Sequence, residues 1–238
     1  MRIQGQPAFV LHARAWRETS FIVEVLTQDY GRLALVARGM TGAKKHNQRA
    51  ALQPMQYVRL DYQLKGEMAS MQQVETLDVA PRLQGDYLLS TFYIHELLLK
   101  LLPRQDAARE VFELYQETRN RLARQESLAW TLRRFERDLL QAIGVGFTLD
   151  VTHDGQECDP AARYRIDIEH GPVRDNRHSA GTVTGAALIA LANDQMPVNE
   201  QLQELRGAMR GLIKEQLGNV ELKSWGLMGE LARVGKAT

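Results

Sequence analysis

Apolar and polar residues alternate in short runs along the first 80 residues, a pattern that predicts half-buried β-strands. The alternation is clearest at 57–63, where Val58, Leu60 and Tyr62 share one face. Five strands are predicted in this way, at 8–13, 20–27, 32–38, 57–63 and 68–74. Five short strands fit a small closed or partly open barrel better than a sandwich of seven or more. We expect an OB-type barrel, with an SH3-like barrel as the alternative.

Near Pro81 the hydrophobic period changes from that of a strand to that of a helix. Helices are predicted at 87–102, 106–124, 127–143, 184–193 and 199–217. Ser127 is expected to cap the third helix and Gly144 to end it. The polar, turn-rich stretch between the third and fourth helices contains two short strand-like pieces around 164–168.

The predicted fold class is therefore α+β, with three parts. Residues 1–80 form an OB-fold domain, and residues 81–149 and 184–238 together form an α-helical domain. Residues 150–183 form a small irregular subdomain that interrupts the helices.

The balanced overall charge conceals a basic N-terminal part. The chain has 30 Lys and Arg against 29 Asp and Glu, which excludes a histone-like tail and an acidic disordered segment. Residues 1–80, however, hold ten Lys and Arg against seven Asp and Glu, and residues 30–60 hold six cations and no acid. The segment 38–49, which contains two glycines, is expected to be a flexible cationic loop after the third strand.

A cationic loop on a barrel suits the phosphate backbone of nucleic acids, because phosphate contacts release counterions and require no particular base sequence. The alternative is a solvated loop without a ligand. The residues predicted to bind DNA are Arg14, Arg32, Arg38, Lys44, Lys45, Arg49 and Arg59. Exposed aromatic side chains near the loop can stack on bases. The candidates are Trp16, Tyr30, Tyr57 and Tyr62, of which Tyr62 is expected in the core.

No pattern in the chain indicates catalysis or a bound cofactor. The G-x-x-x-x-G-K-[ST] and G-x-S-x-G motifs are absent, and His95-Glu96 lacks the second histidine of H-E-x-x-H because Leu99 stands there. Four residues that can bind zinc lie in the stretch 150–183, namely His153, Cys158, His170 and His178. Their spacing matches no standard zinc pattern. We expect neither an enzyme nor a metal or other cofactor.

The single cysteine is typical of a reducing compartment. The apolar run at 8–11 is too short for the core of a signal peptide, and the most apolar window, 87–102, is interrupted by charges and too short to span a membrane. We expect a cytoplasmic, nucleoid-associated protein without a membrane partner.

Three arginines lie close together on the helix predicted at 127–143. Arg133, Arg134 and Arg137 have Glu136 and Asp138 as sequence neighbours, so local ion pairs are the simplest interpretation. The alternative is an anchor for the carboxylate of a partner, which a guanidinium can bind with two hydrogen bonds.

A series of short motifs runs through the first 147 residues. The motifs are Ala8-Phe9-Val10-Leu11-His12-x-Arg14-x-Trp16-x-Glu18-x-Ser20, Leu26-Thr27, Gly31-Arg32, Leu35-Val36-Ala37-Arg38-Gly39, Leu52-Gln53-Pro54, Tyr93-Ile94-x-Glu96-Leu97-Leu98 and Leu132-Arg133-Arg134-Phe135-Glu136, followed by Gly144 and Gly146. As a series they resemble the bacterial RecO family of recombination mediators. The resemblance covers residues 8–147 and weakens toward the C-terminus, where only Leu222-Lys223-Ser224 continues it.

The resemblance implies an N-terminal OB-fold, a helical domain and a zinc-finger-like excursion. It implies a protein that binds single- and double-stranded DNA, anneals complementary strands and acts with RecR to let RecA load on DNA coated by single-stranded DNA-binding protein (SSB). It also implies that the acidic-hydrophobic SSB tail docks on the helical domain, with its terminal carboxylate on Arg133 and with Tyr93 and Leu97 as apolar neighbours. Many family members have four zinc-binding cysteines in the excursion, whereas this chain has Cys158 alone.

Two other functions stay open from the residues themselves. An OB-fold module that binds RNA would use the same cationic loop. A protein-interaction scaffold would instead bind its partners through the helical domain.

Overall fold

The structure is a computed structural model that describes residues 1–40, 45–66, 68–146, 148–177, 179, 181–218 and 220–227. By their packing, these residues divide between two units, Met1–Ala123 and Arg124–Leu227. The first unit contains a barrel and two long helices, and the second contains helices and a small sheet. The three-part division into 1–80, 81–149 with 184–238, and 150–183 stays a prediction.

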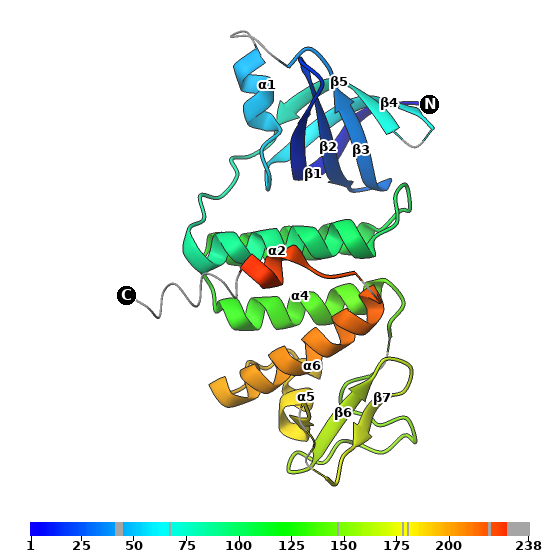
Figure 1. The fold of residues 1–238 in the computed structure, drawn as a ribbon, viewed down its shortest axis with the longest axis vertical. Coiled ribbons are helices and arrows are strands. Elements are labelled where there is room, and N and C mark those ends of the chain that lie inside the picture. Colours follow the sequence, from blue (N-terminus) through cyan, green and yellow to red (C-terminus); the bar gives the residue numbers. More distant parts are fainter. Residues whose placement is uncertain are drawn as a thin grey trace. The chain divides into compact units, whose positions relative to one another are not determined.

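Five strands form a closed barrel in the first unit (Figure 1), as the sequence predicted. They are β1 (Arg2–Trp16), β2 (Ser20–Thr27), β3 (Gly31–Ala37), β4 (Tyr57–Lys65) and β5 (Met68–Thr76). Their order around the barrel is β1-β2-β3-β5-β4, with β3 and β5 parallel and the other described pairs antiparallel. The barrel is of the OB type, and the expectation of this class is confirmed.

The first strand is longer than its alternation predicted, because it takes part in both edges that close the barrel. One half of β1 pairs with β4 and the other half with β2. The register shifts between Ile3 and Gln6 and again between Val10 and His12. Gly5 lies in the first shift at a φ of +68°, which glycine adopts without a steric penalty. Such bulges bend a strand. They also interrupt the alternation of inward and outward residues, so the sequence pattern covers only part of the strand.

A short helix, α1 (His46–Ala51), lies within the segment that was expected to be only a loop. The expectation for 38–49 was therefore wrong at its C-terminal end, and Arg49 lies on a helix. Ala51 and the following Leu52 are buried in the barrel core, which holds the helix in place. Six residues are too few to display a helical period, so the pattern could not reveal α1.

The barrel interior is filled by the inward faces of all five strands. Val10, Val23, Leu35 and Leu60 are almost completely buried, and Tyr62 joins them as its alternation predicted. Burying an aliphatic side chain of this size contributes about 1.5–3 kcal/mol, so this cluster stabilises the barrel.

Two helices, α2 (Gly85–Leu101) and α3 (Arg109–Ala123), complete the first unit. The loop between them lies against the start of β3, where the Gln105 amide donates to the Arg32 carbonyl at 2.9 Å. Gly31 allows this approach, because a Cβ there would stand 1.7 Å from the Asp106 carbonyl oxygen. Its φ of +63° also favours glycine.

An aromatic cluster seats α3 on the outer side of β1. The ring of Phe9 lies 5.0 Å from that of Phe112, 5.0 Å from that of Tyr115 and 4.6 Å from that of Tyr57. The adjacent Val10 points into the barrel, so Phe9 carries the apolar contact to the other side of the strand.

Arg119 of α3 joins three separate segments of the first unit. Its guanidinium donates two hydrogen bonds to the Asp78 carboxylate, at 2.8 and 2.9 Å. It also donates to the carbonyls of Met55 at 2.9 Å and Val79 at 3.2 Å, and it lies 5.6 Å from the centre of the Phe9 ring. The Arg119 side chain is only 6% exposed, whereas Asp78 is 42% exposed. This one side chain thus holds the segment that follows β5 and the segment that precedes β4 against α3.

We expect Arg119→Ala to lower the free energy of unfolding by about 2–4 kcal/mol, because two carbonyls and a carboxylate lose their donor. Urea unfolding followed by circular dichroism measures the change. Arg109→Ala on the same helix is the control, since Arg109 is 64% exposed and its ion pairs are worth at most about 0.5 kcal/mol. Equal losses in the two variants would contradict the role assigned to Arg119.

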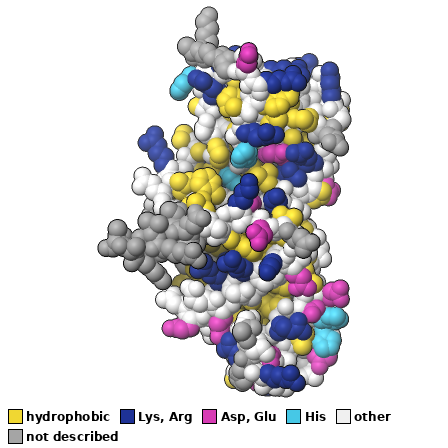
Figure 2. Space-filling view, viewed as in Figure 1, with side chains coloured by type: hydrophobic (Ala, Val, Ile, Leu, Met, Phe, Trp, Pro, Cys, Tyr) yellow, Lys and Arg dark blue, Asp and Glu magenta, His cyan; other side chains and the backbone are white. Residues whose placement is uncertain are grey.

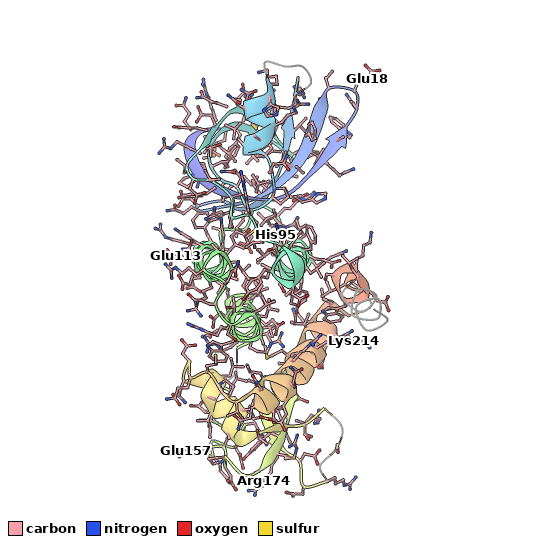
Figure 3. All side chains as sticks on the ribbon, turned by 90° about the vertical axis from the view of Figure 1, so that its left-hand side faces the viewer. Glu18, His95, Glu113, Glu157, Arg174 and Lys214 are labelled. Atoms are coloured by element: carbon pink, nitrogen blue, oxygen red, sulfur yellow. The ribbon has the colours of Figure 1, made fainter. Side chains whose placement is uncertain are left out.

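His95 of α2 is a buried histidine with a polar partner (Figure 3). Its Nε2 lies 2.6 Å from the Tyr115 hydroxyl. Burial lowers the pKa of His95 from 6.5 to about 3; a hydrogen bond with the backbone of Leu11 opposes this shift and the nearby His12 adds to it. The ring is therefore neutral in the folded protein near pH 7.

This shift predicts a loss of stability in mild acid. Between pH 6.5 and 3 the unfolded chain binds a proton that folded His95 does not, so the free energy of unfolding falls as the pH falls. We expect His95 to account for about 1 kcal/mol of the loss between pH 6.5 and 5.5. Urea unfolding at the two pH values should show a smaller loss in His95→Gln, whereas exposed His153→Gln should behave as the unmodified chain. An unchanged loss in His95→Gln would refute the assignment.

The second unit contains α4 (Leu128–Ala142), α5 (Gly185–Ala192), α6 (Asn199–Leu217) and a three-stranded sheet. The sheet has the order β7-β6-β8, from β6 (Arg163–Asp167), β7 (Gly171–Arg174) and β8 (Val183–Thr184). The five helices α2 to α6 were predicted to within about three residues at each end. Ser127 stands at the cap of α4 as expected, but its side chain makes no capping hydrogen bond. Gly144, at a φ of +87°, follows the end of α4.

In the part of the chain that the structure describes, no helix is both long and apolar enough to cross a membrane.

Candidate nucleic-acid interface

Two of the predicted cations are exposed on the barrel without an ion pair among the described residues. Arg14 lies on β1 opposite Ile22, and Arg38 follows the last residue of β3. Ile22 in turn pairs with Val36, two residues before Arg38. Arg14 therefore shares the outer face of the β1–β2–β3 sheet with Ile22 and Val36, and Arg38 lies just beyond the end of β3. Their charges are available to an external anion.

Two other predicted cations are neutralised by acids from neighbouring strands. Arg32 binds Glu24 at 3.0 Å, with both side chains 12% exposed, and also donates to the Leu102 carbonyl at 3.0 Å. Arg59 faces Glu75 directly across β4 and β5, at 3.0 Å. The expectation that 30–60 carries six cations without counter-charges was therefore wrong for these two. Strand pairing supplies acids that the local sequence does not contain.

The remaining described cations of the predicted set are Lys45, at the start of α1, and Arg49, in its last turn. Lys45 donates to Gln48 at 2.9 Å, and the partly exposed Arg49 lines a groove of about 390 Å³. The groove is lined by Ala13, Phe21, His46, Arg49, Ala50, Leu52 and Gln53, none of which is acidic. Lys44 lies outside the described residues. Figure 2 shows Lys and Arg side chains, with apolar side chains between them, over the barrel.

Two further residues, Arg17 in the turn after β1 and Phe21 in the groove, were not among the predicted site residues. Arg17 lies in the turn after β1 at a φ of +57°, with its guanidinium 4.1 Å from the centre of the Trp16 ring. Its position between two predicted strands was a signal that could have identified it. Phe21 has the alternation of an inward-facing residue, and only the position of α1 shows that it lines a groove.

The predicted aromatic residues have mostly structural contacts. Tyr57 stacks on Phe9, and Tyr30 meets the buried Tyr62 edge-on at 6.4 Å. Burial, with smaller contributions from Tyr30 and Asp29, raises the pKa of Tyr62. Trp16 is partly exposed beneath Arg17. The prediction that Tyr62 belongs to the core is confirmed.

The arginines of α4 are held in ion pairs within the second unit. Arg133 lies 2.5 Å from Glu136, and the two side chains are 6% and 1% exposed. Arg134 and Arg137 both bind Asp194, at 3.1 and 2.8 Å. The local pairs expected from the sequence are therefore present, and Asp194 adds a distant one.

Tyr93 and Leu97, the other residues predicted for the SSB tail, are buried on α2 in the first unit. Arg133 belongs to the second unit. Their role stays a prediction.

A separate groove of about 310 Å³ lies in the second unit beside this network. Arg137, Gln141, Asp150, Asp194 and Leu212 are among the residues that line it. The lining mixes both charges, in contrast to the groove beside α1.

The candidate zinc ligands do not converge in the described part of the chain. Cys158 is buried, and its thiol lies 3.8 Å from the Leu149 carbonyl. Burial raises the pKa of this thiol, which disfavours the thiolate that metals bind. His170 instead binds Asp167 at 2.9 Å and lies edge-on to His153. Among the described residues no three of His, Cys, Asp and Glu are grouped as metal ligands, and His178 lies outside that set.

Comparison with known proteins gives matches along the whole chain. The family model described as "Recombination protein O N terminal" matches residues 1–80, and "Recombination protein O C terminal" matches residues 82–226. The DNA repair protein RecO of Xanthomonas oryzae pv. oryzae (strain PXO99A) is 49% identical over 241 residues, covering 98% of this chain and 99% of that protein. RecO of Xylella fastidiosa (strain M12) is 49% identical over 230 residues, covering 94% of this chain and 95% of that protein.

Proposed function

Because the chain belongs to the RecO family of DNA repair proteins, we propose that it mediates DNA repair and recombination by binding single- and double-stranded DNA and annealing complementary strands. In this role it acts with RecR to let RecA load on SSB-coated DNA, in the cytoplasm at the nucleoid. The reaction needs neither catalytic residues nor a cofactor, since annealing forms only base pairs.

The observation that carries this proposal is the set of free cations on the OB-type barrel. Arg14 and Arg38 have no ion pair within the described residues, and the groove beside α1 has an arginine and no acid. Such cations lower the repulsion between the phosphates of two strands, and they bind backbone without restricting base sequence. Bases thus stay free to pair while both strands are held near each other.

The ion pairs on the barrel also rank the predicted DNA-binding residues by their expected contribution to DNA binding. Arg14, Arg38, Lys45 and Arg49 form the central set, to which Lys44 is added from the sequence alone. Arg59 contributes less because Glu75 neutralises it, and Arg32 contributes least because it is largely buried against Glu24. Arg17 extends the set toward the turn after β1.

The salt dependence of DNA binding tests this interface. We expect Arg38→Ala and Arg49→Ala each to reduce the slope of log K against log salt by about 0.7 on single strands, the value for one lost phosphate contact. Arg59→Ala should change it less. Fluorescence anisotropy with a labelled oligonucleotide measures binding, and a fluorescent annealing assay shows whether the variants also pair strands more slowly.

Unchanged slopes for both Arg38→Ala and Arg49→Ala would refute the interface. A preference of the unmodified chain for RNA over DNA of the same sequence would instead favour the RNA-binding alternative.

The SSB tail forms the second part of the proposal. Its terminal carboxylate binds Arg133, with Tyr93 and Leu97 as apolar neighbours, and this requires the Arg133–Glu136 pair to open. Docking on coated DNA raises the effective concentration of the barrel near the strand it acts on. The support for this part is the family resemblance around Arg133.

Binding of a peptide with an acidic, apolar end and a free carboxylate tests this site. We expect the same peptide with an amidated C-terminus to bind at least tenfold more weakly, because the charge that Arg133 holds is gone. Arg133→Lys should weaken binding of the peptide with the free carboxylate and leave DNA binding unchanged. Equal binding of the two peptides would contradict a carboxylate anchor.

A further inference from the structure

The groove beside α1 combines an apolar floor with a cationic side. Ala13 and Phe21 come from the hairpin of β1 and β2, and His46, Arg49 and Gln53 come from α1 and the residues after it. Figure 3 shows the hairpin with Glu18 near its tip, and α1 beside it. Phe21 packs against the barrel core on one side and remains partly exposed in the groove. An aromatic side chain is therefore available to a ligand there.

The occupant has to match both properties. A flat apolar group can contact Phe21 and Leu52, and a negative charge beside it can reach the guanidinium of Arg49. No acid lines the groove. A nucleotide has a flat base attached to a phosphate. The positive charge therefore favours a nucleotide over an uncharged apolar ligand.

We infer that this groove takes one unpaired base of single-stranded DNA, with Phe21 as the stacking surface and Arg49 as the partner of the adjacent phosphate. The inference rests on the proposed function and adds to it a preference between strand forms. Bases of a duplex are stacked inside it and reach such a groove only after flipping, which costs free energy. Phosphate contacts on the barrel hold both strand forms, whereas Phe21 strengthens binding of single strands alone.

Holding a single base is compatible with annealing. The neighbouring bases stay exposed for pairing, and the held base leaves the groove when its partner strand arrives, because pairing replaces the stacking contact. The groove thus releases the duplex product.

Replacing Phe21 tests the inference in the full-length chain. We expect Phe21→Leu, which keeps an apolar side chain against the core, to weaken binding of a thymidine oligonucleotide by about 5- to 150-fold, the range for one lost base–aromatic stack. Binding of a duplex of the same length should change by less than about twofold. Tyr30→Leu is the matched control, because Tyr30 is an aromatic residue of similar exposure packed against the same core and lies outside the groove lining.

A fluorescent base gives a second measurement that a change in folding does not imitate. A thymidine oligonucleotide carrying one 2-aminopurine should lose fluorescence on the unmodified chain through stacking, and this quenching should disappear with Phe21→Leu but persist with Tyr30→Leu. Equal single-strand affinity and equal quenching in all three proteins would overturn the inference while leaving the proposed function intact. Failure of the unmodified chain to bind either strand form would instead overturn the proposed function.

Discussion

The hydrogen bonds of Arg119 are the constraint on which the arrangement of the first unit depends. After β5 the chain leaves the barrel, and before β4 it makes a turn, so carbonyls at both places have no strand partner. A guanidinium has five donors in one plane, and Arg119 uses them on Met55, Asp78 and Val79. Because the same side chain lies over Phe9, α3 is held to the outer side of β1 by polar and apolar contacts together.

Arginine has two different tasks on this barrel, and ion pairing distinguishes them. Arg32 is used by the fold, because it is largely buried and bound to Glu24 and the Leu102 carbonyl. Arg14 and Arg38 have no such partner among the described residues and stay exposed. A charge already neutralised at 3.0 Å has little left for a phosphate, whereas a free exposed charge attracts one over about the Debye length. The proposed interface therefore depends on the cations that have no ion pair among the described residues, and not on the total number of cations.

The second unit holds its small sheet by side-chain contacts that need no cysteine framework. Arg163 of β6 binds Glu204 of α6 at 2.9 Å, and Glu204 also accepts hydrogen bonds from the backbone and hydroxyl of Thr184. Partial burial alone would raise the pKa of Glu204, but the two hydrogen bonds from Thr184 and then the Arg163 pair outweigh it and lower that pKa. Gly185 allows the excursion to approach α5, since a Cβ there would lie 2.0 Å from the Asp159 carbonyl oxygen. These contacts connect the excursion to the helices through residues present in this chain.

The sequence by itself indicated the five barrel strands, the helices α2 to α6 and the family, because periods of 2 and 3.6 and the order of short motifs are local properties of a chain. The periods alone left an OB-type and an SH3-like barrel open. The tertiary structure decided which charged side chains are held in ion pairs and which aromatic side chains are exposed. Strand pairing brought Glu24 to Arg32 and Glu75 to Arg59, folding after α5 brought Asp194 to Arg137, and α1 turned Phe21 from a core residue into the side of a groove. These partners are distant in sequence or in unrelated elements, and no local pattern records the distances between them. For that reason the helices and strands could be predicted from the order of residues. The set of candidate DNA-binding residues could be reduced only once the packing of these elements was known.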